Sequence, residues 1–318
     1  MNVDTFEVRI RQIRLEAEAI ASYELIGVDS APLLPFTAGA HIDLHLPHDV
    51  IRSYSLVNDP AETDRYVIAV QRETEGAGGS AWMHSVPRVG DVLRIGAPLN
   101  DFALAETDGL SVLIAGGIGI TPLLSMARTL HRRRRPWALH YAARSPQEAA
   151  FLGTVQELAS AESSTTVCFG SDRASRMDVR GIVGAAPTDA HLYCCGPARM
   201  IDDFIDACSA RPATSVHHER FAAKAEAAKE GGFELVLNSS GLRLEVGAGR
   251  TILDTLLDHG VDVQYACSAG VCGTCRTGVI DGEPDHRDDY LTDEEKRANR
   301  SIMICCSGSR SRTLVLDI

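Results

Sequence analysis

Three cysteines within one short loop are the clearest chemical signal in the sequence. Cys267, Cys272 and Cys275 lie in the stretch YACSAGVCGTCRTG with the spacing C-x4-C-x2-C, and Cys305 follows in IMICCSGS. A cluster of two irons needs two thiolates for each iron, and this spacing is one that holds a [2Fe–2S] cluster. The sequence therefore predicts four cluster ligands, all in the C-terminal part of the chain.

Details of this loop leave alternatives open. Cys306 adjoins Cys305, so either can be the fourth ligand, although the spacing favours Cys305. Zinc is the competing metal, but structural zinc sites generally pair two separate Cys or Cys/His elements. Gly270 and Gly273 suit an iron–sulfur loop, because glycine adopts unusual backbone angles and lets amide N–H groups approach the sulfurs. The stretch from about 233 to 318 resembles plant-type ferredoxin domains.

A second group of candidate binding residues lies in the N-terminal third. The stretch RSYSL places a cation, an aromatic ring and two hydroxyls side by side, in Arg52, Ser53, Tyr54 and Ser55. Such a set can bind a phosphate, stack on a planar ring and hydrogen-bond its edge, or it can be a plain strand. GAGGSAWMH offers a phosphate-binding turn before a helix, in Gly78, Gly79 and Ser80. The two stretches together resemble the flavin domain of the ferredoxin reductase superfamily.

A third group follows a buried strand in VLIAGGIGITPLLSMARTL. Its glycines are Gly116, Gly117 and Gly119, and we expect Thr121 to cap a helix that has Pro122 in its first turn. The pattern departs from G-x-G-x-x-G, so a plain tight turn is the alternative. The stretch nevertheless resembles the pyridine-nucleotide loop of the superfamily. YCCGPARMID resembles the second element of that site, with Cys195, Gly196 and Pro197.

Three segments with different patterns must position these residues. Residues 1–105 read as short alternating strands, which predicts an antiparallel β-barrel that binds the flavin. Residues 106–221 alternate buried strands with helices, which predicts a parallel-sheet α/β nucleotide domain. Residues 222–232 are small and charged and are predicted to be a linker. Residues 233–318 form the ferredoxin domain, for which the resemblance implies an α+β fold of the β-grasp type. The fold class is therefore multidomain.

Composition excludes several classes of function. The formal net charge is −12, which opposes binding to nucleic acid or an anionic membrane. No apolar run reaches the roughly 20 residues that a membrane span needs. The N-terminal stretch alternates like a strand and lacks the pattern of a secretory signal, so we expect a cytoplasmic protein. Nine cysteines in a reducing compartment favour metal or redox use over disulfides.

Other features have simpler readings. Cys168 and Cys208 are predicted to be buried small hydrophobic residues. The basic run 132–135 follows an apolar helical segment, where cations favour the helix C-terminus. The acidic stretch 281–295 is predicted to be a solvated loop that ends in a capped helix start. Because ferredoxins commonly dock through acidic surfaces, a partner-binding surface is the alternative for that stretch.

The order of flavin barrel, nucleotide domain and ferredoxin domain resembles the phthalate dioxygenase reductase and vanillate O-demethylase reductase family, over nearly the whole chain. The resemblance implies FMN, NADH and one [2Fe–2S] cluster as cofactors. It also implies a partner, a Rieske-type non-haem iron oxygenase that acts on an aromatic compound. Ala77 stands where the family often has Arg, so FAD stays open as the less favoured flavin. We expect a monomer.

The resemblance also implies roles for individual residues. Arg52 and Ser80 would bind the FMN phosphate, and Tyr54 would pack on the isoalloxazine ring. Ser55 would hydrogen-bond the reactive edge of that ring. Phe221, in HHERF, occupies the position where the reductase module ends in a flavin-stacking aromatic residue. Hydride would pass from NADH to the flavin, and single electrons would then reach the cluster, without any general acid or base.

The nicotinamide site is less sharply defined. Cys195 would lie near the nicotinamide ring. Asp172 can accept a hydrogen bond from a ribose hydroxyl and would repel a 2′-phosphate, which favours NADH over NADPH, although Arg173 and Arg176 lie close by. Arg144 is either a cofactor contact or a surface residue. Two other functions compete with the oxygenase reductase: a reductase for a separate cytochrome P450, and an iron–sulfur carrier with an inactive nucleotide domain.

Overall fold

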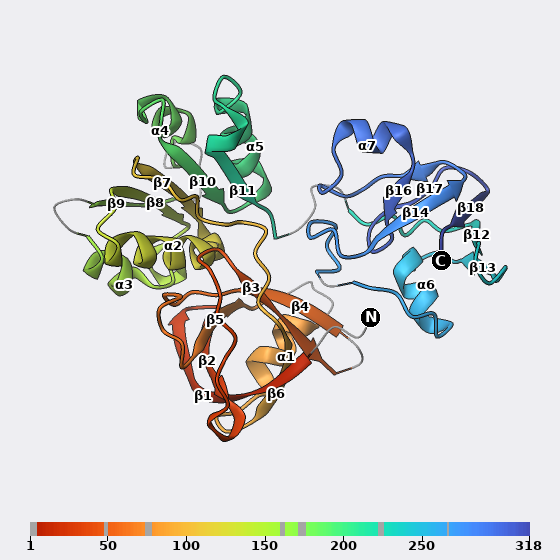
Figure 1. The fold of residues 1–318 in the computed structure, drawn as a ribbon, viewed down its shortest axis with the longest axis horizontal. Coiled ribbons are helices and arrows are strands. Elements are labelled where there is room, and N and C mark those ends of the chain that lie inside the picture. The colour runs from red at the N-terminus through yellow and green to blue at the C-terminus, as the bar shows by residue number, and fades with distance from the viewer. Residues whose placement is uncertain are drawn as a thin grey trace. The chain divides into compact units, whose positions relative to one another are not determined.

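The computed structural model describes residues 5–47, 50–73, 78–159, 163–170, 176–221, 226–265 and 267–318. Within these ranges the chain divides into two compact units, Met1–Arg220 and Phe221–Ile318, whose elements are labelled in Figure 1. No helix in the described ranges is long and apolar enough to cross a bilayer.

The first part of the N-terminal unit is an antiparallel sheet that closes on itself. Its strand order is β4-β3-β6-β1-β2-β5. A bridge between Leu56 and Ile68 joins the two outer strands of this order. Alternating buried positions line the interior, as the sequence pattern predicts. The elements are β1 (Thr5–Ala17), β2 (Ile20–Gly27), the 3-10 turn η1 (Val28–Ser30), β3 (His41–Leu46), β4 (Val50–Ser55), β5 (Tyr66–Gln71), α1 (Gly79–Ser85) and β6 (Val92–Gly96).

The second part of the same unit is a parallel five-stranded sheet with the order β11-β10-β7-β8-β9. All of its pairings are parallel, and every residue of the central strand β7 is buried. The elements are β7 (Ser111–Gly116), η2 (Gly117–Gly119), α2 (Ile120–Arg132), β8 (Trp137–Ala143), η3 (Pro146–Glu148), α3 (Leu152–Glu157), β9 (Ser163–Phe169), α4 (Val179–Ala185), β10 (His191–Cys195), α5 (Ala198–Ala207), η4 (Ala213–Ser215) and β11 (Val216–Glu219).

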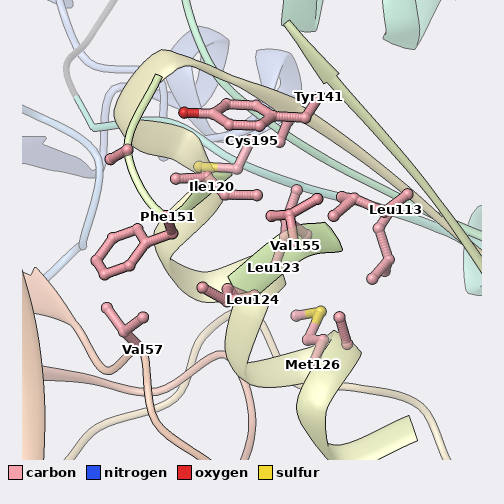
Figure 2. Close-up of a cluster of buried hydrophobic side chains, with 14 of the residues drawn as sticks. Val57, Leu113, Ile120, Leu123, Leu124, Met126, Tyr141, Phe151, Val155 and Cys195 are labelled. Carbon is pink, nitrogen blue, oxygen red and sulfur yellow. The ribbon is translucent and has the colours of Figure 1, made fainter. Parts of the chain in front are cut away.

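One apolar cluster joins the barrel to the parallel sheet. It combines barrel residues such as Val57 with Ile120, Leu123 and Leu124 of α2. Figure 2 shows Val57 beside Leu124 and Phe151 at this junction. Burial of these side chains stabilises the junction by about 25 cal/mol per Å² of apolar surface removed from water. The barrel and the nucleotide fold therefore form one compact unit.

The C-terminal unit is a small α+β fold with its own core. Its main sheet has the order β13-β12-β18-β14-β16, and only β12 and β18 among these pairs run parallel. Thr251 caps α6 with a capping box, as its position before the apolar helix predicts. The elements are β12 (Phe233–Leu237), β13 (Arg243–Val246), α6 (Ile252–Asp258), β14 (Arg276–Asp281), β15 (Pro284–Asp285), α7 (Asp293–Ala298), β16 (Ser301–Met303), β17 (Gly308–Ser309) and β18 (Thr313–Leu316).

Part of the predicted linker packs on this C-terminal unit. The amide of Ala228 donates to the carbonyl of Cys306 at 2.7 Å, and the amide of Gly249 donates to the carbonyl of Lys229 at 2.7 Å. Ala228 is buried. Residues 226–232 are thus held by the ferredoxin fold, and residues 222–225 lie outside the described ranges. The domain boundaries drawn from the sequence stay predictions.

Candidate functional site

Two glycine-containing turns meet at the carboxyl ends of β7 and β10. A Cβ on Gly119 would lie 2.2 Å from the carbonyl oxygen of Cys195, and a Cβ on Gly116 would lie 2.6 Å from Cδ of Pro197. Only glycine allows backbones to approach this closely. In the sheet, β7 lies between β8 and β10, so the chain continues from β7 to β8 on one side and later returns to β10 on the other side. This change of direction is a topological switch point, where open α/β sheets bind their ligands.

The helix after the first turn starts earlier than the sequence predicts. α2 begins at Ile120, with Gly119 as its N-cap residue and no side-chain cap. The expectation that Thr121 caps the helix is wrong, because its Oγ1 donates to the carbonyl oxygen of Ile118 at 2.9 Å instead. Pro122 lies in the first turn, where the missing N–H leaves no helical hydrogen bond unmade. Gly117 takes a φ of 55° at the turn itself.

A carboxylic acid that the sequence analysis missed lies beside Cys195. Cys195 is fully buried, and its Sγ donates to Oε2 of Glu219 at 3.9 Å. The two residues face each other in the parallel register of β10 and β11. Burial, followed by the charge of Asp101, raises the pKa of Glu219 to about 8. Burial and Glu219 together raise the pKa of Cys195, so this pair favours the protonated form of both groups.

The structure also brings together the two candidate flavin stretches. Arg52 is on β4, and a Cβ on Gly79 would lie 3.0 Å from its Cγ, so the first residue of α1 packs against the arginine stem. Gly78 takes a φ of 84° as the N-cap residue of α1. Tyr54 packs against the barrel core, and burial raises its pKa to about 12.

The three serines of this site have different surroundings. Ser53 donates to Oδ1 of Asp43 on the neighbouring strand β3 at 2.5 Å. Ser55 is buried at the end of β4. Ser80 accepts a hydrogen bond from the amide of Glu73 at 3.0 Å. This last contact ties the start of α1 to the segment that follows β5.

Three other predicted residues are considered separately, and the structure tests the surroundings of one of them, Arg144. Arg144 is 78% exposed and lies 3.7 Å from Oε2 of Glu148, which suits a surface residue. Phe221 is 42% exposed and starts the C-terminal unit. Asp172 lies outside the described residues, so its predicted contact with ribose stays a prediction.

The predicted cluster loop brings its thiols together in pairs. Cys267 shares a hydrogen bond with Cys272, and Cys275 shares one with Cys305. The bond with Cys267 lowers the pKa of Cys272 to about 5. Cys306 instead points its Sγ at the carbonyl of Met303 and at Ser307, 3.8 Å from each oxygen. This arrangement supports Cys305 rather than Cys306 as the fourth ligand.

The loop fits a two-iron cluster in its donors and its backbone. In the described ranges, no three His, Cys, Asp or Glu side chains are placed to hold a single metal ion. Two pairs of thiols are what two irons require. The amide of Ala269 donates to Sγ of Cys267 at 3.3 Å, and Oγ1 of Thr274 lies 3.3 Å from Sγ of Cys272. Such hydrogen bonds stabilise anionic sulfur.

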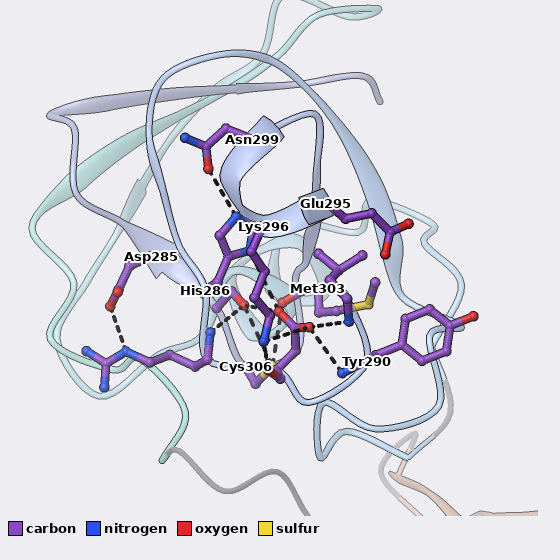
Figure 3. Close-up of polar contacts among 12 residues, drawn as sticks. Asp285, His286, Tyr290, Glu295, Lys296, Asn299, Met303 and Cys306 are labelled. Carbon is purple, nitrogen blue, oxygen red and sulfur yellow. Dashed lines mark hydrogen bonds and ion pairs between the residues drawn. The ribbon is translucent and has the colours of Figure 1, made fainter. Parts of the chain in front are cut away.

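A buried carboxylate, Asp288, belongs to the polar network next to the cluster loop, and Figure 3 shows Tyr290, Lys296 and Cys306 of this region. Asp288 is 2% exposed, and its carboxylate accepts from the amide of Leu291 at 2.8 Å and from the hydroxyl of Ser307 at 3.4 Å. Lys296 lies 3.8 Å from the same carboxylate. The ring of Tyr290 covers Gly273 so closely that a Cβ there would lie 2.2 Å from the ring.

Two family models match the chain. Residues 113–206 match the oxidoreductase NAD-binding domain, and residues 235–309 match the 2Fe-2S iron-sulfur cluster binding domain. The first range contains both turns of the switch point. The second contains the four thiols and Asp288. The chain is thus an oxidoreductase with a nucleotide domain and an iron–sulfur domain.

Proteins of the same length resemble the whole chain. The solved structure of phthalate dioxygenase reductase matches it with a TM-score of 0.84 and 38% identity, over 99% of this chain and 98% of that chain. The chain belongs to the phthalate dioxygenase reductase family. Within this family, the phenoxybenzoate dioxygenase subunit beta of Ectopseudomonas oleovorans is 49% identical over 98% of this chain and 97% of its own. The tetrachlorobenzoquinone reductase of Sphingobium chlorophenolicum is 43% identical over 99% of both chains.

Membership of the phthalate dioxygenase reductase family confirms the resemblance and the three-part fold drawn from the sequence. The solved member is described as a modular structure for electron transfer from pyridine nucleotides to [2Fe-2S]. The residue roles within each site stay predictions.

Proposed function

We propose that the protein is the NADH-dependent reductase component of a two-component oxygenase that acts on an aromatic compound. One observation carries the proposal: a nucleotide switch point with a buried Cys195 and a loop with two thiol pairs are present in one chain. The nucleotide switch point suits NADH, a two-electron donor, and the thiol loop suits an iron–sulfur cluster, a one-electron carrier. Relatives that are named as parts of dioxygenase systems support an oxygenase as the acceptor.

The bound groups would supply the redox chemistry, which is the conversion of one hydride into single electrons. The chain's own residues bind and orient them. Arg52 and the turn Gly78–Ser80 would hold the phosphate of FMN, the favoured flavin, and Tyr54 and Ser55 would contact its ring. NADH would be held by the turns Gly116–Gly119 and Cys195–Pro197. Phe221 would stack on the flavin. Cys267, Cys272, Cys275 and Cys305 would be the cluster ligands.

The partner is proposed to be a Rieske-type non-haem iron oxygenase, and the reductase is proposed to be a cytoplasmic monomer. The reductase would not touch the aromatic substrate, because electrons alone pass between the two proteins. A cytochrome P450 is the competing acceptor, and isolation of the native complex separates the two by haem absorbance.

A second candidate function is direct reduction of a quinone. The 43% identical relative that is named tetrachlorobenzoquinone reductase favours it. A quinone can accept electrons from a flavin without an oxygenase, so the two functions differ in their need for the cluster. Replacement of Cys272 by Ser should abolish oxygenase reduction and leave quinone reduction with NADH intact.

The deciding experiment is an anaerobic NADH titration of the purified protein, followed by low-temperature EPR. We expect reduction of both the flavin and a [2Fe–2S] cluster, and the Cys272→Ser variant should show flavin reduction alone. A wild-type sample that contains iron and flavin but is not reduced by NADH would overturn the proposal. The chain would then be a carrier that another protein reduces.

A further inference from the structure

One helix connects the two candidate cofactor sites of the N-terminal unit. The first residues of α2 directly follow the glycine turn of the switch point, and residues from its middle to its end contact the barrel. The barrel segment that it reaches, Asn58–Glu62, begins three positions after Ser55 of the flavin strand. A helix is rigid over this length, so contacts at one end determine where the other end lies.

Three polar contacts join the helix to the barrel segment. The hydroxyl of Ser125 donates to the carbonyl of Asn58 at 2.8 Å. Nε of Arg132 donates to Oδ2 of Asp59 at 2.9 Å, and a terminal nitrogen of Arg128 lies 3.8 Å from Oε1 of Glu62. Ser125 is fully buried. We refer to these six residues as the α2 clasp.

The barrel side of the clasp is itself fixed. The Asn58 side chain accepts from the amide of Val67 at 2.9 Å and donates to the carbonyl of Arg65 at 3.0 Å. Arg65 in turn donates to Oε2 of Glu62 at 2.6 Å. Asn58 is 2% exposed and Asp59 is 8% exposed. The segment therefore cannot shift without breaking several hydrogen bonds away from water.

Apolar packing alone would not fix the helix so closely. Leu123 and Leu124 bury it against the barrel, but apolar contact is non-directional and allows small slides. Hydrogen bonds and ion pairs require specific distances and angles. Among the described residues, Nε of Arg128 has no hydrogen-bond partner, and the guanidinium pairs with Glu62 through a terminal nitrogen.

We propose that the α2 clasp is a positioning device for hydride transfer, which sets the nicotinamide turn against the flavin strand. The inference rests on the proposed function, because it concerns the step between NADH and flavin. In this proposal the clasp residues act through the position of α2 and not by direct contact with a cofactor. Loosening the clasp should therefore misplace the nicotinamide while leaving flavin content and the cluster unchanged.

The test compares Glu62→Gln with wild type by anaerobic stopped-flow mixing with NADH. Glu62→Gln keeps the shape of the side chain and removes its charge. We expect a limiting rate of flavin reduction at least about fivefold lower, because small misplacements of reacting groups can slow a reaction by up to about 10²-fold. The long-wavelength absorbance of the nicotinamide–flavin charge-transfer complex should weaken in parallel. Flavin content is measured to normalise the rates.

The matched control is Glu106→Gln. Glu106 is 81% exposed and pairs at 2.8 Å with Arg133, the residue directly after α2, without reaching the barrel segment. The Glu106→Gln variant should have the same limiting rate of flavin reduction and the same charge-transfer absorbance as wild type. Ser125→Ala, which removes one hydrogen bond and no charge, should act in the same direction as Glu62→Gln and is measured whether or not Glu62→Gln folds.

The outcomes separate the two proposals. If wild type is reduced by NADH and both clasp variants keep the wild-type rate and absorbance, the clasp has no positioning role. The clasp also has no positioning role if the control Glu106→Gln slows flavin reduction as much as Glu62→Gln and Ser125→Ala do. If wild type itself is not reduced by NADH, the proposed function fails instead, whatever the variants do.

Discussion

At the scale of single residues, Glu219 is a carboxyl group whose pKa the fold raises well above its ordinary value. Its pKa is raised to about 8 from an ordinary value of 4.5, first by burial and then by Asp101. At a pH between the pKa of the unfolded chain, 4.5, and the pKa in the native protein, about 8, Glu219 keeps a proton in the native protein that the unfolded chain has released. Stability therefore falls as pH rises through this window, and below it Glu219 contributes no pH dependence.

The prediction is that Glu219→Gln removes part of this pH dependence. The amide cannot ionise, so the free energy of unfolding of the variant should fall less between about pH 5 and pH 8 than that of wild type. The difference in slope is at most about 1.4 kcal/mol per pH unit. Urea unfolding of both proteins without nucleotide, at several pH values, measures it. Equal slopes would show that Glu219 is already ionised in the native state at neutral pH.

Sequence motifs predicted the residues whose role depends on local backbone shape. Gly116 and Gly119 were predicted from their place after a buried strand, and the structure shows the close approach of Cys195 and Pro197 that requires them. Glu219 was missed because its environment is not local. It lies in a polar stretch, HHERF, and becomes a neighbour of Cys195 only when β10 and β11 pair.

At the scale of elements, the cluster loop depends on one glycine more than its spacing shows. Gly273 takes a φ of 78°, and a Cβ there would collide with the Tyr290 ring. The backbone amide of Tyr290 is held in turn by Asp288, at 3.2 Å from Oδ2. A side chain at position 273 must therefore displace either the loop or the segment behind it.

We predict that Gly273→Ala lowers the iron content of the purified protein by at least about half, because both the strained φ and the collision oppose the native loop. Iron analysis and visible absorbance measure the loss. Gly247→Ala is the control, since that glycine lies in the same unit with open space around its Cβ position and no positive φ. Full iron content in Gly273→Ala would mean that Tyr290 moves aside without cost to the loop.

Elements with strong periodicity were predictable, and short connecting segments were not. In α6, the Thr251 capping box and the apolar residues that follow it are local features that can be read directly from the sequence. Residues 226–232 lack an apolar pattern, so nothing in their sequence indicated the hydrogen bond from Ala228 to Cys306. Likewise, Thr121 seemed a natural N-cap, but the glycine turn continues directly into α2 and places Thr121 inside the helix.

At the scale of the whole molecule, the chain consists of two units with separate cores. The core of the C-terminal unit runs from Phe233 to Leu316. The buried residues of the other apolar clusters lie between Val8 and Cys208. A domain with its own hydrophobic core can fold alone. The order of motifs along the sequence predicted separate nucleotide and cluster domains, because the nucleotide motifs all precede the cluster motifs.

The last prediction follows from these separate cores. A chain that ends at Phe221 keeps every described residue of the nucleotide and flavin sites and loses the four thiols. Because a unit with its own core can fold alone, we expect the shortened protein to reduce ferricyanide with NADH within about twofold of the full chain. Ferricyanide can take electrons directly from a flavin, so this reaction does not need the cluster. Electron transfer to the oxygenase should be lost.

The full-length Cys272→Ser variant is the matched control, because it removes one proposed ligand and keeps the C-terminal unit. It should behave like the shortened protein with both acceptors. Loss of ferricyanide reduction in the shortened protein alone would show that the C-terminal unit contributes structure to the nucleotide or flavin site. Retained oxygenase reduction in either protein would mean that electrons leave from the flavin, and the cluster would then have another role.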